Sequence, residues 1–266
     1  MTGDLIASRD NPRIKRLRRL AQDGTAYRRE GRVWVEGDHL CAAALAQGHR
    51  PDAVVVTPAG SHWVERWRRE GRLAADVPVW TVTEAVMRHI SALESPSNVA
   101  CLLPLAGATP VRPDVPTVVL DRLQDPGNVG SILRSAAAFG FTQVIALRTT
   151  AALWSPKVLR AGMGAHFGLH LVEGADAAAV EALRVPLIAT SSHQGAWLHT
   201  ARLPWPCAWL FGHEGQGVDP AWLARATTTV RIIQPGGQES LNVAAAAAIC
   251  LHASAVARAT NATGAR

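Results

Sequence analysis

Polar and apolar positions in the first part of the chain alternate in the pattern of short strands and helices. Asn11 and Pro12 form a helix start, because asparagine caps helices and proline fits a first turn, and Ile14, Leu17 and Leu20 follow at helical spacing. Further strands are predicted at 33–35, 53–57, 79–82 and 98–103, and further helices at 39–47, 63–69 and 84–91. Alternation of this kind predicts a layered α/β domain with a mostly parallel sheet.

A proline-rich stretch separates this series from a second one. Residues 104–116 hold four prolines and little periodicity, which favours a linker. Beyond it, strands are predicted at 117–120, 143–147, 166–172, 186–190, 207–211 and 229–233, and helices at 129–139, 157–160, 175–183 and 240–257. We therefore expect an N-terminal domain over 1–104, a linker over 105–116 and a second α/β domain over 117–266.

The composition is typical of a folded cytoplasmic protein. Hydrophobic residues make up 48% of the 266 positions and charged residues 18%, which is enough apolar material for two cores. No apolar run approaches the roughly 18–20 residues of a membrane span, and the N-terminus lacks the apolar segment of a signal peptide. The cysteines Cys41, Cys101, Cys207 and Cys250 are scattered, so we expect buried thiols rather than a zinc site or disulfides.

The net charge of +6 and the pI of about 9.9 favour a polyanionic partner such as a nucleic acid. The positive charge is concentrated in residues 9–32, where the acids are Asp10, Asp23 and Glu30. On the first predicted helix the basic side chains occupy the face opposite the apolar one. A solvated face and an RNA-binding face both stay open, and the RNA-binding residues would be Arg9, Asn11, Arg13, Lys15, Arg16 and Arg19.

The first segment with candidate chemistry spans residues 120–135, where a strand ends and a helix begins. Asn128 stands where we expect the N-cap of this helix. Arg134 lies on the helix face opposite the apolar residues, so Asn128 and Arg134 are predicted to converge near a helix N-terminus, which favours an anionic group. The alternative is a capped helix with a surface arginine.

Two glycine-rich bends follow later in the chain. In residues 210–217, Gly212, Glu214 and Gly217 belong to a G-x-x-G-x-G order that is neither a dinucleotide-binding turn nor a P-loop. The His213-Glu214 pair also lacks the H-E-x-x-H spacing of a zinc protease. In residues 232–243, a glycine turn brings Ser240 and Asn242 to the start of an alanine-rich helix. A tight turn and an ordinary helix cap are the plain alternatives.

Together and in this order, the three segments resemble the SpoU (TrmH-like) family of RNA ribose 2′-O-methyltransferases in the SPOUT superfamily. Its N-x-G-x-x-x-R, G-x-E-G-x-G and S-L-N-V motifs are matched by residues 128–134, 212–217 and 240–243. The first domain resembles the family's substrate-binding module through S-x-x-N-P-x-x-K at 8–15 and V-E-G at 35–37. The sequence departs from the family at Ile233-Gln234, where Pro-Met is usual, and at 95–98, where a P-Q-G is usual.

The resemblance implies an α/β fold in which a smaller α/β/α domain, similar to ribosomal RNA-binding proteins, precedes a SPOUT-type α/β domain with a deep trefoil knot. It implies a homodimer that needs no metal, and it favours ribosomal over transfer RNA. S-adenosyl-L-methionine would bind against Thr190, Leu210, Gly212, Gly217, Ile232, Gln234 and Leu241. Arg134 would act on the target nucleotide, as a base or as an electrostatic clamp. Asn128, Glu214, Ser240 and Asn242 would hold Arg134 and the loops in place.

Two functions from other classes compete with a methyltransferase. A non-catalytic RNA-binding or ribosome-assembly protein would bind RNA without the cofactor, but it has no need for polar residues in all three segments. A nucleotide-dependent dehydrogenase would require a glycine fingerprint and an acidic ribose ligand that this sequence lacks at the right places.

Overall fold

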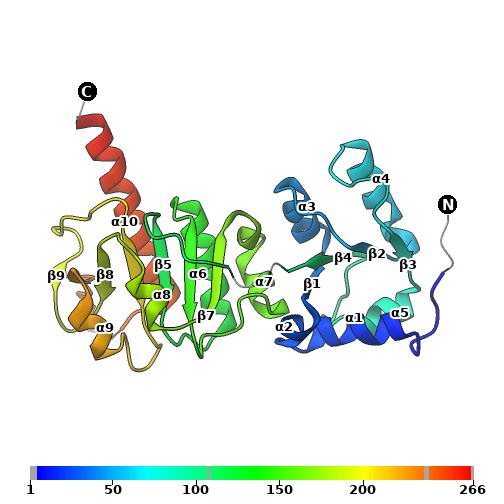
Figure 1. Cartoon of the computed structure of the whole chain (residues 1–266), viewed down its shortest axis with the longest axis horizontal. Coiled ribbons are helices and arrows are strands. Elements are labelled where there is room, and N and C mark those ends of the chain that lie inside the picture. The colour runs from blue at the N-terminus through cyan, green and yellow to red at the C-terminus, as the bar shows by residue number, and fades with distance from the viewer. Residues whose placement is uncertain (1–4, 106, 108, 237–239, 265–266) are drawn as a thin grey trace. The chain divides into compact units, whose positions relative to one another are not determined.

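Two sheets organise the chain in the computed structural model, which describes residues 5–105, 107, 109–236 and 240–264 (Figure 1). The chain divides into two compact units. The first comprises the residues up to Gly107 together with Trp154–Phe167, and the second comprises Ala108–Leu153 and Gly168–Arg266. The segment Trp154–Phe167 thus packs with the first unit although it follows the linker in sequence.

The sheet of the first unit has the order β1 (Arg32–Glu36), β4 (Val99–Pro104), β2 (Ala53–Val56), β3 (Val79–Thr81). β4 is antiparallel to both of its neighbours, while β2 and β3 pair in parallel. The prediction of a mostly parallel sheet is therefore wrong for this unit. The first residue of β4, Val99, lies opposite the last residue of β2, Val56, so the chain returns to the sheet edge that it had just left. The alternation of strand and helix patterns in the sequence does not show whether a strand such as β4 runs parallel or antiparallel to its neighbours.

Helices cover both faces of this sheet. α3 (Asp38–Ala46) and α4 (Ser61–Arg69) lie on one side, and α1 (Pro12–Gln22), α2 (Ala26–Glu30) and α5 (Glu84–Ile90) lie on the other (Figure 1). α7 (Pro156–Gly162) packs against β1. The predicted start of α1 is confirmed, because Asn11 Oδ1 accepts a hydrogen bond from Arg13 N at 2.9 Å. Ile14, Leu17 and Leu20 are buried, so the basic residues of α1 face outward.

The sheet of the second unit is parallel, as the sequence predicts. Its order is β7 (His170–Ala175), β6 (Gln143–Leu147), β5 (Thr117–Leu120), β10 (Ala208–Phe211), β8 (Leu187–Thr190), β11 (Thr228–Arg231), β9 (Ala196–Trp197). Every pair of neighbours described in it is parallel. The predicted strand at 166–172 is wrong in its first half, where a 3-10 turn over Ala165–Gly168 precedes β7. The sequence also did not predict β9, α2 or α9 (Pro220–Arg225).

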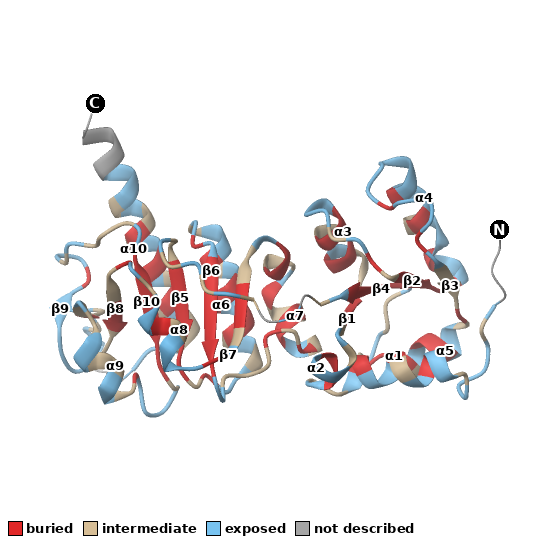
Figure 2. Ribbon diagram, viewed as in Figure 1, coloured by how far each residue is buried: buried red, intermediate tan, exposed pale blue. Residues whose placement is uncertain are grey.

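Helices also cover both faces of the second sheet, and its central strands β5, β6 and β10 are buried throughout (Figure 2). α6 (Pro126–Ala138) and α10 (Val243–Gly264) pack together, and α10 is tied to β10 by a hydrogen bond of 2.9 Å from Trp209 Nε1 to Ser254 Oγ. On the opposite face, α8 (Ala177–Glu181) and α9 cover a core that includes Val119, Ile145 and Leu210. This layering leaves the carboxyl ends of the strands open for loops, which is where open α/β sheets bind ligands.

α10 carries one feature that the sequence analysis missed. Over Val243–Thr260 it is long and apolar enough to span a bilayer by length and composition, with a mean hydropathy of 1.5. The expectation that no apolar run reaches this length is therefore wrong. The helix is rich in alanine, which raises the mean hydropathy but does not form a conspicuous run of large apolar side chains. This composition explains both why the helix is apolar enough to span a bilayer and why the sequence analysis missed it. One side of α10 packs on α6 and β10 through Ala247, Cys250 and Leu251.

Candidate active site

A cleft of about 370 Å³ lies at the carboxyl ends of β8, β10 and β11. Its walls come from three stretches: residues 190–193 after β8, residues 211–218 after β10, and the bend after β11 with the start of α10. The two glycine-rich bends predicted from the sequence thus face the same cleft. Gly237, Gln238 and Glu239 of the second bend lie outside the described residues. The volume is that of a typical small-molecule site.

The residues predicted to contact a cofactor fall into two groups. Those that line the cleft are Thr190, Gly212, Gly217, Ile232, Gln234 and Leu241. Leu210 does not line it, because its side chain points from β10 into the core under α8 and α9 and is fully buried. Its main chain still shapes the cleft, since the Leu210 carbonyl accepts a hydrogen bond from Thr190 Oγ1 at 3.3 Å. The expectation that Leu210 lies near the cofactor therefore concerns its main chain, and it stays a prediction.

The loop over residues 212–217, called here the glycine loop, is closed by its own contacts. Gly217 N donates to the carbonyl of His213 at 2.8 Å, and His213 Nδ1 accepts from Gly215 N at 3.0 Å and Gln216 N at 3.3 Å. A side chain at Gly212 would overlap the backbone of Gly217 and the residue after it. The glycine at this position is therefore required by the loop's own fold.

A chain of hydrogen bonds joins the three sequence segments. Asn128 Nδ2 donates to Glu214 Oε1 at 3.3 Å, and Asn128 Oδ1 accepts from Asn242 Nδ2 at 2.9 Å. Asn242 Oδ1 in turn accepts from Ala244 N and Ala245 N, and so caps α10. Segments more than a hundred residues apart are thus held at fixed positions around one cleft, and Ser240 lies in its wall.

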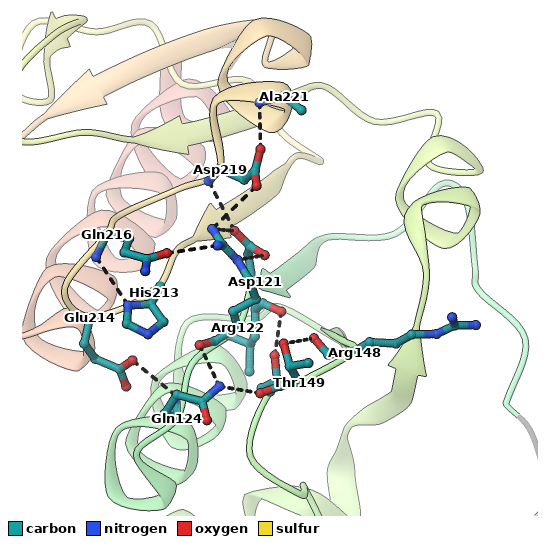
Figure 3. A network of polar contacts seen from close by, with 12 residues as sticks. Asp121, Arg122, Gln124, Arg148, Thr149, His213, Glu214, Gln216, Asp219 and Ala221 are labelled. Carbon is teal, nitrogen blue, oxygen red and sulfur yellow. Dashed lines mark hydrogen bonds and ion pairs between the residues drawn. The ribbon is translucent and has the colours of Figure 1, made fainter.

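Glu214 is a fixed carboxylate at the junction of two loops. Its oxygens accept from Gln124 N at 3.2 Å and Asp125 N at 3.1 Å as well as from Asn128 (Figure 3 shows the Gln124 contact). Partial burial acts to raise the pKa of Glu214, but these hydrogen bonds to the charged form outweigh it and hold the pKa below its ordinary value. Glu214 is therefore an ionised hydrogen-bond acceptor rather than a proton donor.

The start of α6 differs from the prediction. Asp125 caps the helix, because its Oδ1 accepts from Asn128 N at 2.7 Å and Pro126 occupies the first helical position. Asn128 therefore lies in the first turn and is not the cap. The Asp-Pro sequence was the available signal, since proline is favoured directly after a cap. The side chain of Asn128 is consequently free to reach Glu214 and Asn242.

Arg134 lies on the exposed face of α6, as predicted, but not in the wall of the cleft. It makes no hydrogen bond or ion pair with the part of the chain that the structure describes. The structure thus brings together Asn128, Glu214, Asn242 and Ser240. Arg134 lies on the same helix as Asn128, outside this group.

Sequence analysis missed a second polar network beside the glycine loop (Figure 3). It centres on Asp121 and Arg122, which directly follow β5, and it reaches Gln216 and Asp219 at the far side of the glycine loop. The usable signal was a carboxylate directly after the apolar strand β5, because polar residues at the carboxyl ends of parallel strands gather at ligand sites.

The basic face of α1 has more acidic partners than the sequence suggested. Arg16 and Arg19 both pair with Glu30, at 2.7 and 3.0 Å, and Lys15 pairs with Asp10 at 3.0 Å. The other three predicted RNA-binding residues differ in their contacts. The guanidinium of Arg13 lies 5.2 Å from the centre of the Trp80 ring, Arg9 is exposed, and the side chain of Asn11 is occupied as the helix cap.

The pKa of His89, on α5, is also affected by the positive charge of α1 and the residues before it. Burial lowers the pKa of His89, and the nearby guanidinium groups of Arg18 and Arg9 lower it further. No group of three or more histidine, cysteine or acidic side chains that could hold a metal ion occurs among the described residues.

Comparison with known proteins agrees with this architecture. The SpoU rRNA Methylase family matches residues 116–252, and the MRM3-like substrate binding domain matches residues 11–101. An uncharacterized tRNA/rRNA methyltransferase of Synechocystis sp. is 32% identical over 95% of this chain and 94% of its own length. The 23S rRNA (guanosine(2553)-2′-O)-methyltransferase RlmP of Bacillus subtilis is 28% identical over 82% of this chain and 86% of its own.

A solved structure extends the similarity to the whole fold. The SpoU methyltransferase AviRb of Streptomyces viridochromogenes, in complex with the cofactor AdoMet, superposes with a TM-score of 0.81 at 26% identity, covering 93% of this chain and 98% of AviRb. The family match covers more than half of the chain, and the three motif segments meet at one cleft. The chain belongs to the SpoU rRNA methylase family.

Proposed function

We propose that this chain transfers the methyl group of S-adenosyl-L-methionine to a ribose 2′-hydroxyl of ribosomal RNA. The observation that carries the proposal is the hydrogen-bonded chain from Glu214 through Asn128 to Asn242, which joins the three family motifs around the cleft. The names of the relatives support the substrate, since RlmP acts on a 2′-hydroxyl of 23S rRNA and a Streptomyces viridochromogenes relative, 28% identical, acts on another.

The lining of the cleft fits this cofactor. Ile232 and Leu241 supply apolar surface for an adenine ring, and the serine and threonine hydroxyls of residues 190–192 can bind polar groups. Gln234 gives a more specific indication, because its buried Oε1 makes no hydrogen bond to any described residue. An unpaired buried acceptor is unfavourable, so a donor on the ligand would stabilise it. The exocyclic amine of adenine is such a donor.

The chain's own residues supply positioning and charge rather than a proton acceptor. S-adenosyl-L-methionine supplies an electrophilic methyl group when bound. The ribose oxygen must be held in line with that methyl group, and alignment of this kind accounts for much of the rate. The guanidinium of Arg134 stays protonated and only donates hydrogen bonds, so it is a poor base. We assign it to the target phosphate and to the charge that develops on the 2′-oxygen.

Arg134→Ala tests the proposal. We expect cofactor affinity close to that of the wild type, measured by calorimetry, and methyl transfer to ribosomal RNA at least about a hundredfold slower, as for loss of a key electrostatic group. Arg148→Ala removes another exposed arginine of the same unit and serves as the matched control. Wild-type turnover in Arg134→Ala would refute the role of Arg134. Absence of cofactor binding by the wild-type chain would refute the function itself.

The homodimer and the trefoil knot belong to the same proposal. α10 supports a dimer, because Ile249 and Val256 are 42% and 49% exposed one heptad apart on a helix whose other side is packed. Ile249→Glu should shift the sedimentation coefficient toward that of a single chain. A ribosomal substrate also favours a cytoplasmic location, which fractionation of the host cell would test.

A further inference from the structure

The glycine loop forms one wall of the cofactor cleft, yet its own sequence gives it little rigidity. Gly212, Gly215 and Gly217 lose more conformational freedom on ordering than any other residue type would. Contacts with neighbouring segments are therefore needed, in addition to the hydrogen bonds within the loop, to keep it in its cleft-forming shape. Glu214 provides such contacts at one edge, through its hydrogen bonds to residues 124, 125 and 128.

Arg122 holds the opposite edge of the glycine loop (Figure 3). Its Nη1 donates to Gln216 Oε1 at 3.2 Å, and its Nη2 lies 3.8 Å from Asp219 Oδ2, just beyond the loop. The same guanidinium donates through Nε and Nη2 to the two carboxylate oxygens of Asp121, each at 3.0 Å. Asp121 Oδ2 accepts a further bond from Asp219 N at 3.2 Å. One side chain thus ties the end of β5 to Gln216 within the loop and to Asp219 just beyond it.

The backbone of Arg122 is unusual in a way that agrees with this role. Its φ of +59° is in the left-handed region, which a residue with a side chain adopts at a cost. Thr149, with a φ of +70°, is in the same region, and the amide of Gln124 bonds the carbonyls of both residues. Strained residues that cluster beside a ligand site indicate that the surrounding contacts hold a functional geometry. Arg122 itself does not line the cleft, so it would act on a ligand through the loop.

We infer that Arg122 is a positioning residue that fixes the glycine loop for S-adenosyl-L-methionine through Gln216, an inference that rests on the proposed function. The loop has two clamps: the first motif segment, which holds Glu214 of the loop, and Arg122 at the end of β5, which holds Gln216. The planar fork of arginine is needed, because it must serve Asp121 and Gln216 at once. Lysine would keep the buried Asp121 paired, yet it has only one nitrogen to share between the two partners.

The test measures cofactor affinity by calorimetry in the full chain for Arg122→Lys, Gln216→Ala and the double variant. We expect Arg122→Lys and Gln216→Ala each to weaken binding on the order of tenfold, the usual loss for a charge-assisted hydrogen bond. The double variant should be no weaker than the weaker single one, because both changes break the same contact. At saturating cofactor, kcat should return to nearly the wild-type value, and melting temperatures should change little.

Arg148→Lys is the matched control, since Arg148 points away from this network and its nearest acid is at 3.9 Å (Figure 3). The inference is overturned if Arg122→Lys binds the cofactor as the wild type does, if the two losses multiply in the double variant, or if a drop in melting temperature accounts for the loss. Failure of the wild-type chain to bind the cofactor would instead overturn the proposed function, so the two failures are distinguishable.

Discussion

At the scale of single residues, the two glycines flanking Glu214 make different demands. A Cβ at Gly212 would overlap the backbone of Gly217, whereas a Cβ at Gly215 would meet only the ring of His213 at 3.8 Å, an ordinary contact. We therefore expect Gly212→Ala to abolish cofactor binding and to lower the melting temperature by several degrees, about what 1–2 kcal/mol produces in a chain of this size. Gly215→Ala should retain its melting temperature. Calorimetry and thermal unfolding of both variants test this, and equal behaviour would contradict it.

The lowered pKa of Glu214 predicts how the stability of the folded protein changes in acid. Its pKa is lower in the folded protein than its ordinary value of 4.5, so its contribution is complete above that value and is lost as the pH falls through the lowered pKa. Glu214→Gln should be less stable than the wild type at neutral pH, and the difference should shrink in acid. Melting temperatures from about pH 7 to about pH 3 measure it. A difference that does not depend on pH would contradict the assignment.

At the scale of elements, α10 depends on close packing of small side chains. Burial raises the pKa of the Cys250 thiol on α10 to about 12 and that of the Cys207 thiol, just before β10, to about 11. Thiolates are the reactive form, so neither cysteine should react with a thiol reagent at about pH 8 in the folded protein. Ser254→Ala removes the hydrogen bond to Trp209 that ties α10 to β10, and it should speed labelling. Rapid labelling of the native wild type would show that α10 is not packed as described.

The basic face of α1 predicts an unequal contribution of its arginines to RNA binding. Arg16 and Arg19 share Glu30, whereas Arg9 is exposed and Arg13 stacks on Trp80. Arg9→Ala with Arg13→Ala should therefore reduce the slope of log affinity against log salt by about two, as for two lost phosphate contacts. Arg16→Ala with Arg19→Ala removes the same charge and should reduce it less. Equal slopes for both pairs would mean that only net charge matters.

The sequence predicted those elements whose position is determined by the local spacing of apolar residues. The strands of the second sheet follow from apolar runs, and β5 and β6 have the predicted bounds. The direction of β4 depends on where the chain re-enters the sheet, and β9 is too short to show a period. In the site, the motif residues were found because they recur in a family. The contact from Arg122 to Gln216 spans 94 positions and has no local pattern.

At the scale of the whole molecule, a single boundary in the sequence does not separate the two compact units. The segment Trp154–Phe167 lies beyond the proline-rich linker, but its Val158, Leu159 and Phe167 are buried in the first unit. His49 Nε2 lies 3.1 Å from the carbonyl of Phe167, and the two rings are in edge contact. The first unit thus includes a helix, α7, that lies about 50 residues beyond the end of its own continuous sequence. The sequence before the linker therefore does not contain the whole of the first unit.

A truncated chain that begins at Ala108, the first residue of the second unit, tests this interdependence. It keeps the cofactor cleft and the glycine loop, but it loses the surface that covers α7, so Val158, Leu159 and Phe167 should be exposed. Exposed apolar patches promote association, and we expect several-fold stronger binding of an apolar dye and lower solubility than for the full chain. Val158→Ser with Leu159→Ser in the truncated chain should reverse much of the dye binding, whereas in the full chain the same pair should be destabilising, because it places hydroxyls in a packed core. Dye binding by the truncated chain as low as that of the full chain would mean that α7 finds cover within the second unit. The linker alone would then separate the units.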